Sequence, residues 1–143
     1  MKTHISITVS NVKESIHFYE RMFGTGPAKV KADYAKFDLA QPPLNFSMNQ
    51  GTFERGGSVS HFGLQVDSTD DVLNITERWN AEGLLNSEEM KTDCCYALQD
   101  KTWVKDPDGN SWEVFTVLEN TDGGREATAC CTKVGESSVS ACC

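Results

Sequence analysis

Two kinds of hydrophobic spacing alternate along the chain. Apolar Ile5, Ile7 and Val9 alternate with polar neighbours, which predicts a strand because successive side chains of a strand point to opposite faces. Residues 10–24 carry an apolar stripe at helical spacing and end in a glycine, so they predict a capped amphipathic helix. Strand-like runs follow at residues 29–32, 34–40 and 44–49.

The same succession returns in the second half of the chain. Residues 4–26 align with residues 61–83 at an offset of 57, which matches His4 with His61. The closing strands align at an offset of 68, which matches Asn45 with Glu113. An internal repeat of this kind indicates duplicated structural units. The second unit therefore reads as a strand at 62–66, a helix at 68–83 and strands near 88–92, at 97–106 and at 111–118.

The repeat predicts an α+β fold in which each unit has the order βαβββ. We expect a single domain over residues 1–119, with module one at 1–57 and module two at 58–119. Residues 120–143 are polar and nearly free of large apolar side chains, so they predict a flexible C-terminal tail. The tail carries four cysteines of unassigned role, Cys130, Cys131, Cys142 and Cys143.

Composition and charge exclude several classes of protein. The 143 residues have a net charge of −8, which argues against nucleic acid or an anionic membrane as the main partner. No apolar run is long enough to span a bilayer, and the first residues turn polar too early for a signal-peptide core. We therefore predict a cytoplasmic protein, in which thiols stay reduced.

Strand parity selects three candidate metal ligands. If the apolar residues of each strand pack under a helix, His4, His61 and Glu113 turn to the opposite face. Should the two sheets curl together, these side chains would share one metal cleft in a mixed sheet. Two imidazoles and a carboxylate suit non-haem Fe(II), and also Zn(II), Ni(II) or Mn(II). The competing interpretation is that the histidines are structural and that Glu113 is an exposed strand carboxylate.

The six cysteines form three adjacent pairs, which is unlike a disulfide framework. Cys94 and Cys95 lie in an eleven-residue surplus of the second module relative to the first. Two thiolates on neighbouring residues can converge on one soft, thiophilic atom. The alternative is a pair of small loop residues without a function.

These motifs together resemble a known family. One histidine opening each βαβββ unit and the sequence DPDGNSWE closing the second resemble the vicinal oxygen chelate superfamily. Within it, the segments YAKF, PPLNFS and DCCYA are similar to the ArsI-type carbon–arsenic lyases, which include CadI-like proteins. The resemblance covers residues 1–120. It implies Fe(II) as cofactor, His4, His61 and Glu113 as its ligands, and Cys94 and Cys95 as the site for trivalent arsenic.

The resemblance implies an Fe(II)-dependent dioxygenase that cleaves the carbon–arsenic bond of trivalent organoarsenicals, such as methylarsenite and trivalent aromatic arsenicals, and releases arsenite. Its partners would be the organoarsenical and O2, it would confer organoarsenical resistance, and the chain would be a monomer or a homodimer. Two alternatives stay open. One is a protein that sequesters As(III) or Cd(II) through its thiol pairs; the other is a metalloenzyme of the glyoxalase or fosfomycin-resistance type. Asn45, a poor ligand where a fourth would be expected, argues against a glyoxalase site.

Overall fold

The computed structural model describes residues 1–54, 59–94 and 97–120. The predictions for Cys95 and for the tail therefore lie outside the described residues, and Cys94 is described by its backbone alone. Within the described part of the chain, no helix is both long and apolar enough to cross a membrane.

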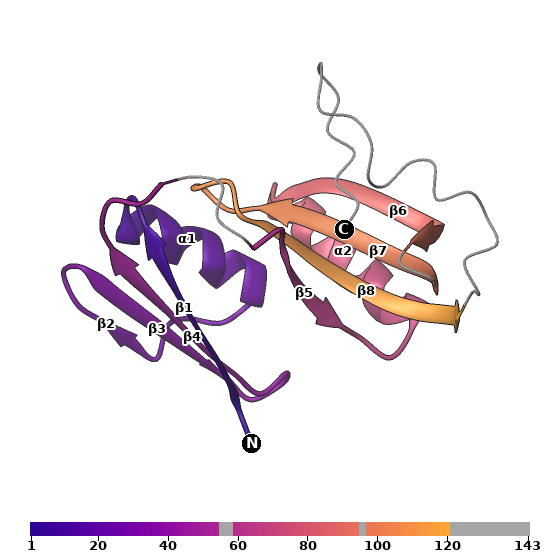
Figure 1. The fold of residues 1–143 in the computed structure, drawn as a ribbon, viewed down its shortest axis with the longest axis horizontal. Helices are drawn as coiled ribbons and strands as arrows, with labels where there is room; N and C mark the ends of the chain where they lie inside the picture. The colour runs from indigo at the N-terminus through magenta and orange to yellow at the C-terminus, as the bar shows by residue number, and fades with distance from the viewer. Residues whose placement is uncertain (55–58, 95–96, 121–143) are drawn as a thin grey trace, which may run out of the picture.

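The first module contains one helix and four strands, as the repeat predicts. Strand β1 (Thr3–Val9) is followed by helix α1 (Val12–Phe23) and then by the strands of a sheet with the order β1-β4-β3-β2 (Figure 1). Strand β1 runs parallel to β4, and the other neighbours in this sheet are antiparallel. The remaining strands are β2 (Lys29–Val30), β3 (Tyr34–Leu39) and β4 (Leu44–Gln50).

The second module repeats this topology. Strand β5 (Phe62–Gln65) precedes helix α2 (Thr69–Ala81), and the sheet has the order β5-β8-β7-β6. Strand β5 is parallel to β8, whereas β6, β7 and β8 are antiparallel neighbours. The predicted fold class, two tandem βαβββ modules with mixed sheets, is therefore confirmed. The last strands are β6 (Leu85–Cys94), β7 (Ala97–Lys105) and β8 (Ser111–Asn120).

A side chain caps the N-terminus of each helix. The Asn11 side chain accepts hydrogen bonds from the amides of Lys13 and Glu14, and the Ser68 side chain accepts one from the amide of Asp71. These bonds satisfy amides that have no partner inside the helix. Helix α1 ends at Gly24, whose φ of 69° lies in the left-handed region that glycine adopts without a steric penalty.

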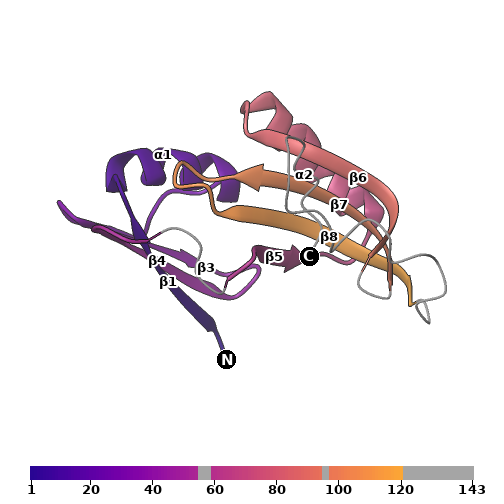
Figure 2. The same ribbon diagram turned by 45° about the horizontal axis from the view of Figure 1, so that its top comes forward.

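The two modules share one hydrophobic core. It joins the inner faces of β3 and β4 with α1, and it continues into Trp79, Val104, Trp112 and Val114 of the second module. Tyr19 is fully buried at the junction, where its ring lies 4.6 Å from that of Phe46 and 6.0 Å from that of Trp112, measured between centroids. A contiguous core of this kind ties the modules, which lie side by side in Figure 2, into one packed body.

Polar contacts pin the boundary between the modules at one end. The Tyr19 hydroxyl donates a 2.7 Å hydrogen bond to Asp106 Oδ2 and accepts one of 3.1 Å from Trp112 Nε1. Burial, with the adjacent Asp106 charge, raises the Tyr19 pKa far above its ordinary value, so the hydroxyl stays a donor. The backbone amide of Ser10 donates to Asp108 Oδ2 at 3.0 Å. The turn at 106–110 thus docks module two onto the start of module one and α1.

A second set of contacts joins the C-terminal ends of the helices. Trp79 Nε1 donates to the Met22 carbonyl at 3.0 Å, and Arg78 donates to the same oxygen at 3.0 Å. In the opposite sense, Arg21 donates to the Glu82 carbonyl at 3.0 Å. Arg21 and Arg78 are the residues that the repeat aligns, so each module uses the equivalent arginine to hold the other.

Candidate metal and thiol site

Two of the three predicted ligands meet on the face of the second sheet that points away from α2. His61 immediately precedes β5, and its Nε2 lies 3.4 Å from Glu113 Oε1 on β8. The His61 Nδ1 lies 2.8 Å from the Ser60 hydroxyl, which holds the ring. The Trp103 ring packs edge-on at 5.3 Å between centroids. His61 therefore directs Nε2, the nitrogen that would bind a metal, toward the Glu113 carboxylate.

The Glu113 carboxylate is buried between two cationic or potentially cationic groups. Its side chain is about one-tenth exposed, with Lys101 Nζ 3.8 Å from Oε2 and His61 on the side of Oε1. Burial raises the pKa of Glu113 above its ordinary value, while Lys101 and His61 oppose that rise. A carboxylate held in this environment has a reason to bind a further cation. The interpretation of Glu113 as an exposed strand carboxylate is wrong.

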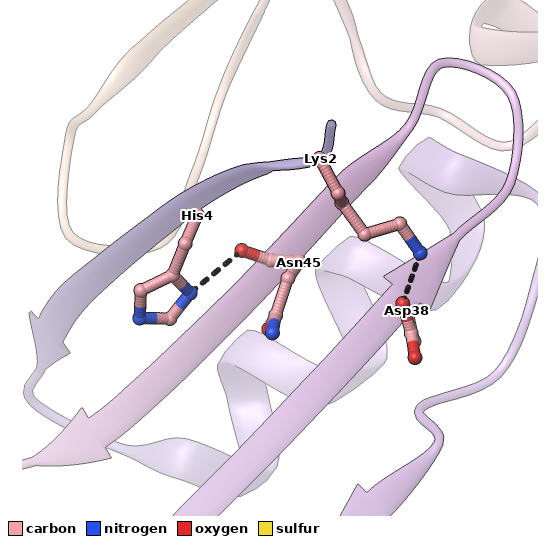
Figure 3. A network of polar contacts seen from close by, with 4 residues as sticks. All are labelled: Lys2, His4, Asp38 and Asn45. Carbon is pink, nitrogen blue, oxygen red and sulfur yellow. Dashed lines mark hydrogen bonds and ion pairs between the residues drawn. The ribbon is translucent and has the colours of Figure 1, made fainter.

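His4 lies on the open face of the first sheet. Its Nδ1 lies 3.0 Å from the backbone carbonyl of Asn45 on β4 (Figure 3). A carbonyl only accepts, so Nδ1 is the donor of this hydrogen bond, and Nε2 is the nitrogen left for a metal. This is the arrangement in which a histidine is oriented for metal binding through its other nitrogen. Beside it, Lys2 pairs with Asp38 and lowers the pKa of that carboxyl.

The structure does not bring His4 to the other two ligands. Among the described residues, no three His, Cys, Asp or Glu side chains are grouped so as to hold a metal ion. In Figure 1, β1 starts beside the N-terminus at the bottom of the view, whereas β5 starts near the boundary between the modules. The expectation that all three share a cleft within one chain is therefore not met, because the shared core sets the modules side by side with open sheets.

The register also changes the symmetry argument about Asn45. His4 pairs with Asn45 across β1 and β4, but Gly63, not His61, pairs with Glu113 across β5 and β8. Gly63 corresponds to Ser6 at the 57-residue offset, and Ser6 pairs with Ser47. Ser47, not Asn45, is thus the counterpart of Glu113 by register. The sequence alignment of the closing strands was wrong by two residues. The hydrophobic pattern cannot reveal such an error, because a shift of two keeps every side chain on its predicted face.

Sequence reasoning missed the β7 residues of this face. Trp103 pairs directly with Glu113, and Lys101 lies two residues before Trp103 on the same face of β7. Trp103 and Lys101 are each 2% exposed. Strand parity applied to residues 97–106 would have found them. Buried side-chain polar atoms that lack a hydrogen-bond partner within the described part of the chain include Trp103 Nε1 and Asn45 Oδ1. One lies in each half of the candidate site, where a ligand could satisfy it.

Gly63 leaves room for the Glu113 side chain. A Cβ at this position would lie 3.1 Å from Glu113 Oε1 and 3.2 Å from its Cγ. We expect Gly63→Ala to displace the carboxylate by a few tenths of an ångström and to weaken metal binding by about tenfold, since small displacements of a site are costly. Anaerobic Co(II) titration measures this. Gly51→Ala is the matched control, because its Cβ would crowd Thr8 at 3.2 Å without touching Glu113. Equal affinity in both variants would contradict the prediction.

Of the predicted thiol pair, only the backbone of Cys94 lies within the described residues, and it ends β6. The Cys94 backbone pairs with Ala97, six residues along β7 from Trp103, or about 20 Å by strand rise. Bulges interrupt the register between Glu89 and Thr92 and between Leu98 and Gln99, and Lys91 has a φ of 51°. Bulges bend and twist the strands that carry them. The described end of β6 and the start of β7 thus continue the sheet beyond these irregularities.

The fold and these residues define a class of protein. The model of the Glyoxalase/Bleomycin resistance protein/Dioxygenase superfamily matches residues 3–114, and the chain belongs to this superfamily. A solved member, described as a glyoxalase/bleomycin resistance protein/dioxygenase from Alicyclobacillus acidocaldarius, superimposes with a TM-score of 0.69. The match covers 83% of this chain and 92% of that one at 16% identity, which supports the fold alone.

Relatives with a higher sequence identity to this chain indicate which family within the superfamily it resembles. The chain is 44% identical over 142 residues to the "Probable trivalent organoarsenical cleaving enzyme" of Bacillus subtilis (strain 168), covering 98% of this chain and 97% of the relative. It is also 44% identical to the "Trivalent organoarsenical cleaving enzyme" of Bacillus sp. (strain MD1), covering 98% and 88% respectively. The predicted resemblance to this family is confirmed.

Proposed function

We propose that this protein cleaves the carbon–arsenic bond of trivalent organoarsenicals as an Fe(II)-dependent dioxygenase. The observation that carries the proposal is the buried Glu113 carboxylate facing His61 Nε2 at 3.4 Å, in a chain 44% identical to proteins named for this cleavage. A carboxylate that faces one nitrogen of an imidazole whose other nitrogen is held by a hydrogen-bonding partner has the arrangement found among metal ligands.

The donor set fits Fe(II) in kind. His61 and Glu113 would hold the metal, with His4 as third ligand, and bound Fe(II) would supply the activation of O2. Trp103 and Lys101 line the site from the β7 side, where each side chain is buried. Among the described residues of one chain, His4 is not grouped with His61 and Glu113.

The thiols would hold the substrate. A trivalent organoarsenical RAs(OH)2 has two exchangeable hydroxyl groups, so Cys94 and Cys95 can both bond to arsenic and leave the organic substituent free. Soft trivalent arsenic prefers sulfur ligands, while Fe(II) is expected to bind the nitrogen and oxygen ligands. The two would therefore bind to different side chains of the site. The proposal requires that the thiol-bound arsenical presents its carbon–arsenic bond near Glu113, since catalysis depends on positioning.

For methylarsenite the reaction balances with one O2 and no external reductant. CH3As(OH)2 and O2 contain the atoms of arsenite, As(OH)3, and formaldehyde, CH2O. The carbon–arsenic bond breaks, the methyl carbon is oxidised to the aldehyde and O2 is reduced. We therefore expect one O2 consumed for each arsenite released.

Arsenic speciation tests the proposal. Purified protein is loaded with Fe(II) without oxygen and mixed with methylarsenite or a trivalent aromatic arsenical, and air is then admitted. We expect arsenite in molar excess over protein, only with both Fe(II) and O2 and not in an iron-free control. Organoarsenical that stays intact and bound to protein would contradict the proposal and favour a thiol protein that sequesters arsenic or cadmium.

A further inference from the structure

One aromatic residue lies on the face of Glu113 without a place in the hydrophobic core. Phe115 follows Glu113 by two residues on β8, so strand alternation turns both side chains to the same face. Within the described part of the chain, the shared core includes Val114 but neither contains Phe115 nor has it packed against its edge. Phe115 is only partly buried, whereas Trp103 and Lys101 on β7 are 2% exposed. Part of an aromatic surface beside the carboxylate is therefore open to a small molecule.

Gly63 leaves the ring and the carboxylate side by side. A Cβ at this position would lie 3.4 Å from Phe115 Cε1 and 3.1 Å from Glu113 Oε1. Both atoms therefore border the point at which a side chain of residue 63 would begin. Because glycine has no side chain, position 63 itself covers neither the ring edge nor the carboxylate. A molecule that reaches Glu113 from this face thus meets the edge of Phe115 as well.

Phe115 lies on the side of Glu113 that leads toward the candidate thiols. Strand β8 pairs with β7 as far as Ala97, and Ala97 pairs in turn with the Cys94 backbone. Val117, the next β8 residue of this face, is also apolar and partly buried. On β8, the path from the carboxylate to that end of the sheet is therefore apolar.

We propose that Phe115 contacts the organic substituent of a bound trivalent organoarsenical and makes the site prefer aromatic over methyl substituents. The inference deepens the proposed function and rests on it for the place of the substrate. Two thiols displace both hydroxyl groups of RAs(OH)2 as water, so the substituent R remains to face the sheet. Cleavage requires the bond between R and arsenic to lie near Glu113, which places R beside Phe115.

The size of R decides how much of this ring it covers. An aromatic R buries apolar area against Phe115 and can pack edge-to-face with it, a geometry that aromatic pairs favour. A methyl group covers little of the ring and has no such geometry. Phe115 is therefore a specificity-determining residue, which acts on the choice of substrate and leaves the attachment of arsenic to the thiols.

Binding of two arsenicals to the full-length protein tests the inference. Phenylarsenite and methylarsenite are titrated separately without oxygen, so that no turnover occurs, and binding is measured by equilibrium dialysis with elemental detection of arsenic. We expect Phe115→Ala to lower the preference for phenylarsenite over methylarsenite by about tenfold, while affinity for methylarsenite stays within about twofold of the wild type. Comparing this preference between variants removes the intrinsic difference of the two arsenicals toward thiols.

Two further variants make the test decisive. Phe115→Leu keeps apolar bulk without the ring and should lower the preference by about threefold, and it decides the outcome alone should Phe115→Ala not fold. Leu73→Ala is the matched control, because Leu73 is 37% exposed on α2, the helix that packs against the same sheet from its other face. Its preference should equal that of the wild type. An unchanged preference in the Phe115 variants, or an equal loss of affinity for both arsenicals, would overturn the inference.

The proposed function and this inference fail in different ways. If the preference falls in the Phe115 variants but the wild type releases no arsenite, the substituent contact stands and the proposed cleavage is wrong. If the wild type releases arsenite but the Phe115 variants keep its preference, the cleavage stands and the role of Phe115 is wrong.

Discussion

Replacing Glu113 by glutamine is expected to lower turnover of methylarsenite by at least about 100-fold, more than substitutions outside a metal's direct ligands usually cost. The change keeps the shape of a side chain that is 8% exposed but removes the charge that faces His61 and Lys101. Metal affinity should fall with it, as measured by Co(II) titration and by arsenite release. Wild-type turnover in this variant would show that Glu113 is not a ligand.

The same substitution should not weaken the metal-free fold. Burial raises the Glu113 pKa, so its charged form is less favourable in the folded protein than in the unfolded chain. Stability from this group is present below its unfolded pKa and is lost as pH rises through its folded pKa. The glutamine variant would lack that loss, so thermal unfolding of the metal-free variant at neutral pH should occur at the wild-type temperature or above. A large decrease in the unfolding temperature would instead indicate that Glu113 is needed for packing.

Substituting serine for either Cys94 or Cys95 is expected to weaken binding of a trivalent organoarsenical by on the order of 100-fold or more. After the first thiol has bonded to arsenic, the second bond is intramolecular, and such linkage adds roughly 10²- to 10⁴-fold in apparent affinity. Serine cannot replace it, because a hydroxyl is a hard ligand and trivalent arsenic is soft. Binding is measured by equilibrium dialysis with elemental detection of arsenic.

Two controls separate arsenic capture from the rest of the site. Co(II) binding should be unchanged in Cys94→Ser and Cys95→Ser, because sulfur is not part of the expected N/O metal site. The tail variant Cys130→Ser/Cys131→Ser should keep wild-type affinity for the organoarsenical. Full turnover at low substrate in either of the first two variants would contradict the capture role.

The elements and their order could be predicted from the sequence because periodicity is a local property. Ile5, Ile7 and Val9 fix the phase of β1 on their own, and Asn11 and Ser68 mark the helix starts through bonds to amides two or three residues away. The placement of His61 and Glu113 on one face followed from the same parity. The role of these residues as Fe(II) ligands was predicted from the resemblance to the carbon–arsenic lyase family.

Only the tertiary structure decided how these faces meet. Strand parity does not change when a strand shifts by two residues, so the pattern of either strand could not predict that Glu113 pairs with Gly63. The burial of Lys101 beside Glu113 depends on neighbours far along the chain. Tyr19 contacts Asp106 and Trp112 across 87 and 93 residues of chain, and in this packing the described residues form no group that unites His4 with His61 and Glu113. The sequence by itself determined the local elements and the side chains on each face, whereas long-range packing determined which of those side chains one chain can bring together.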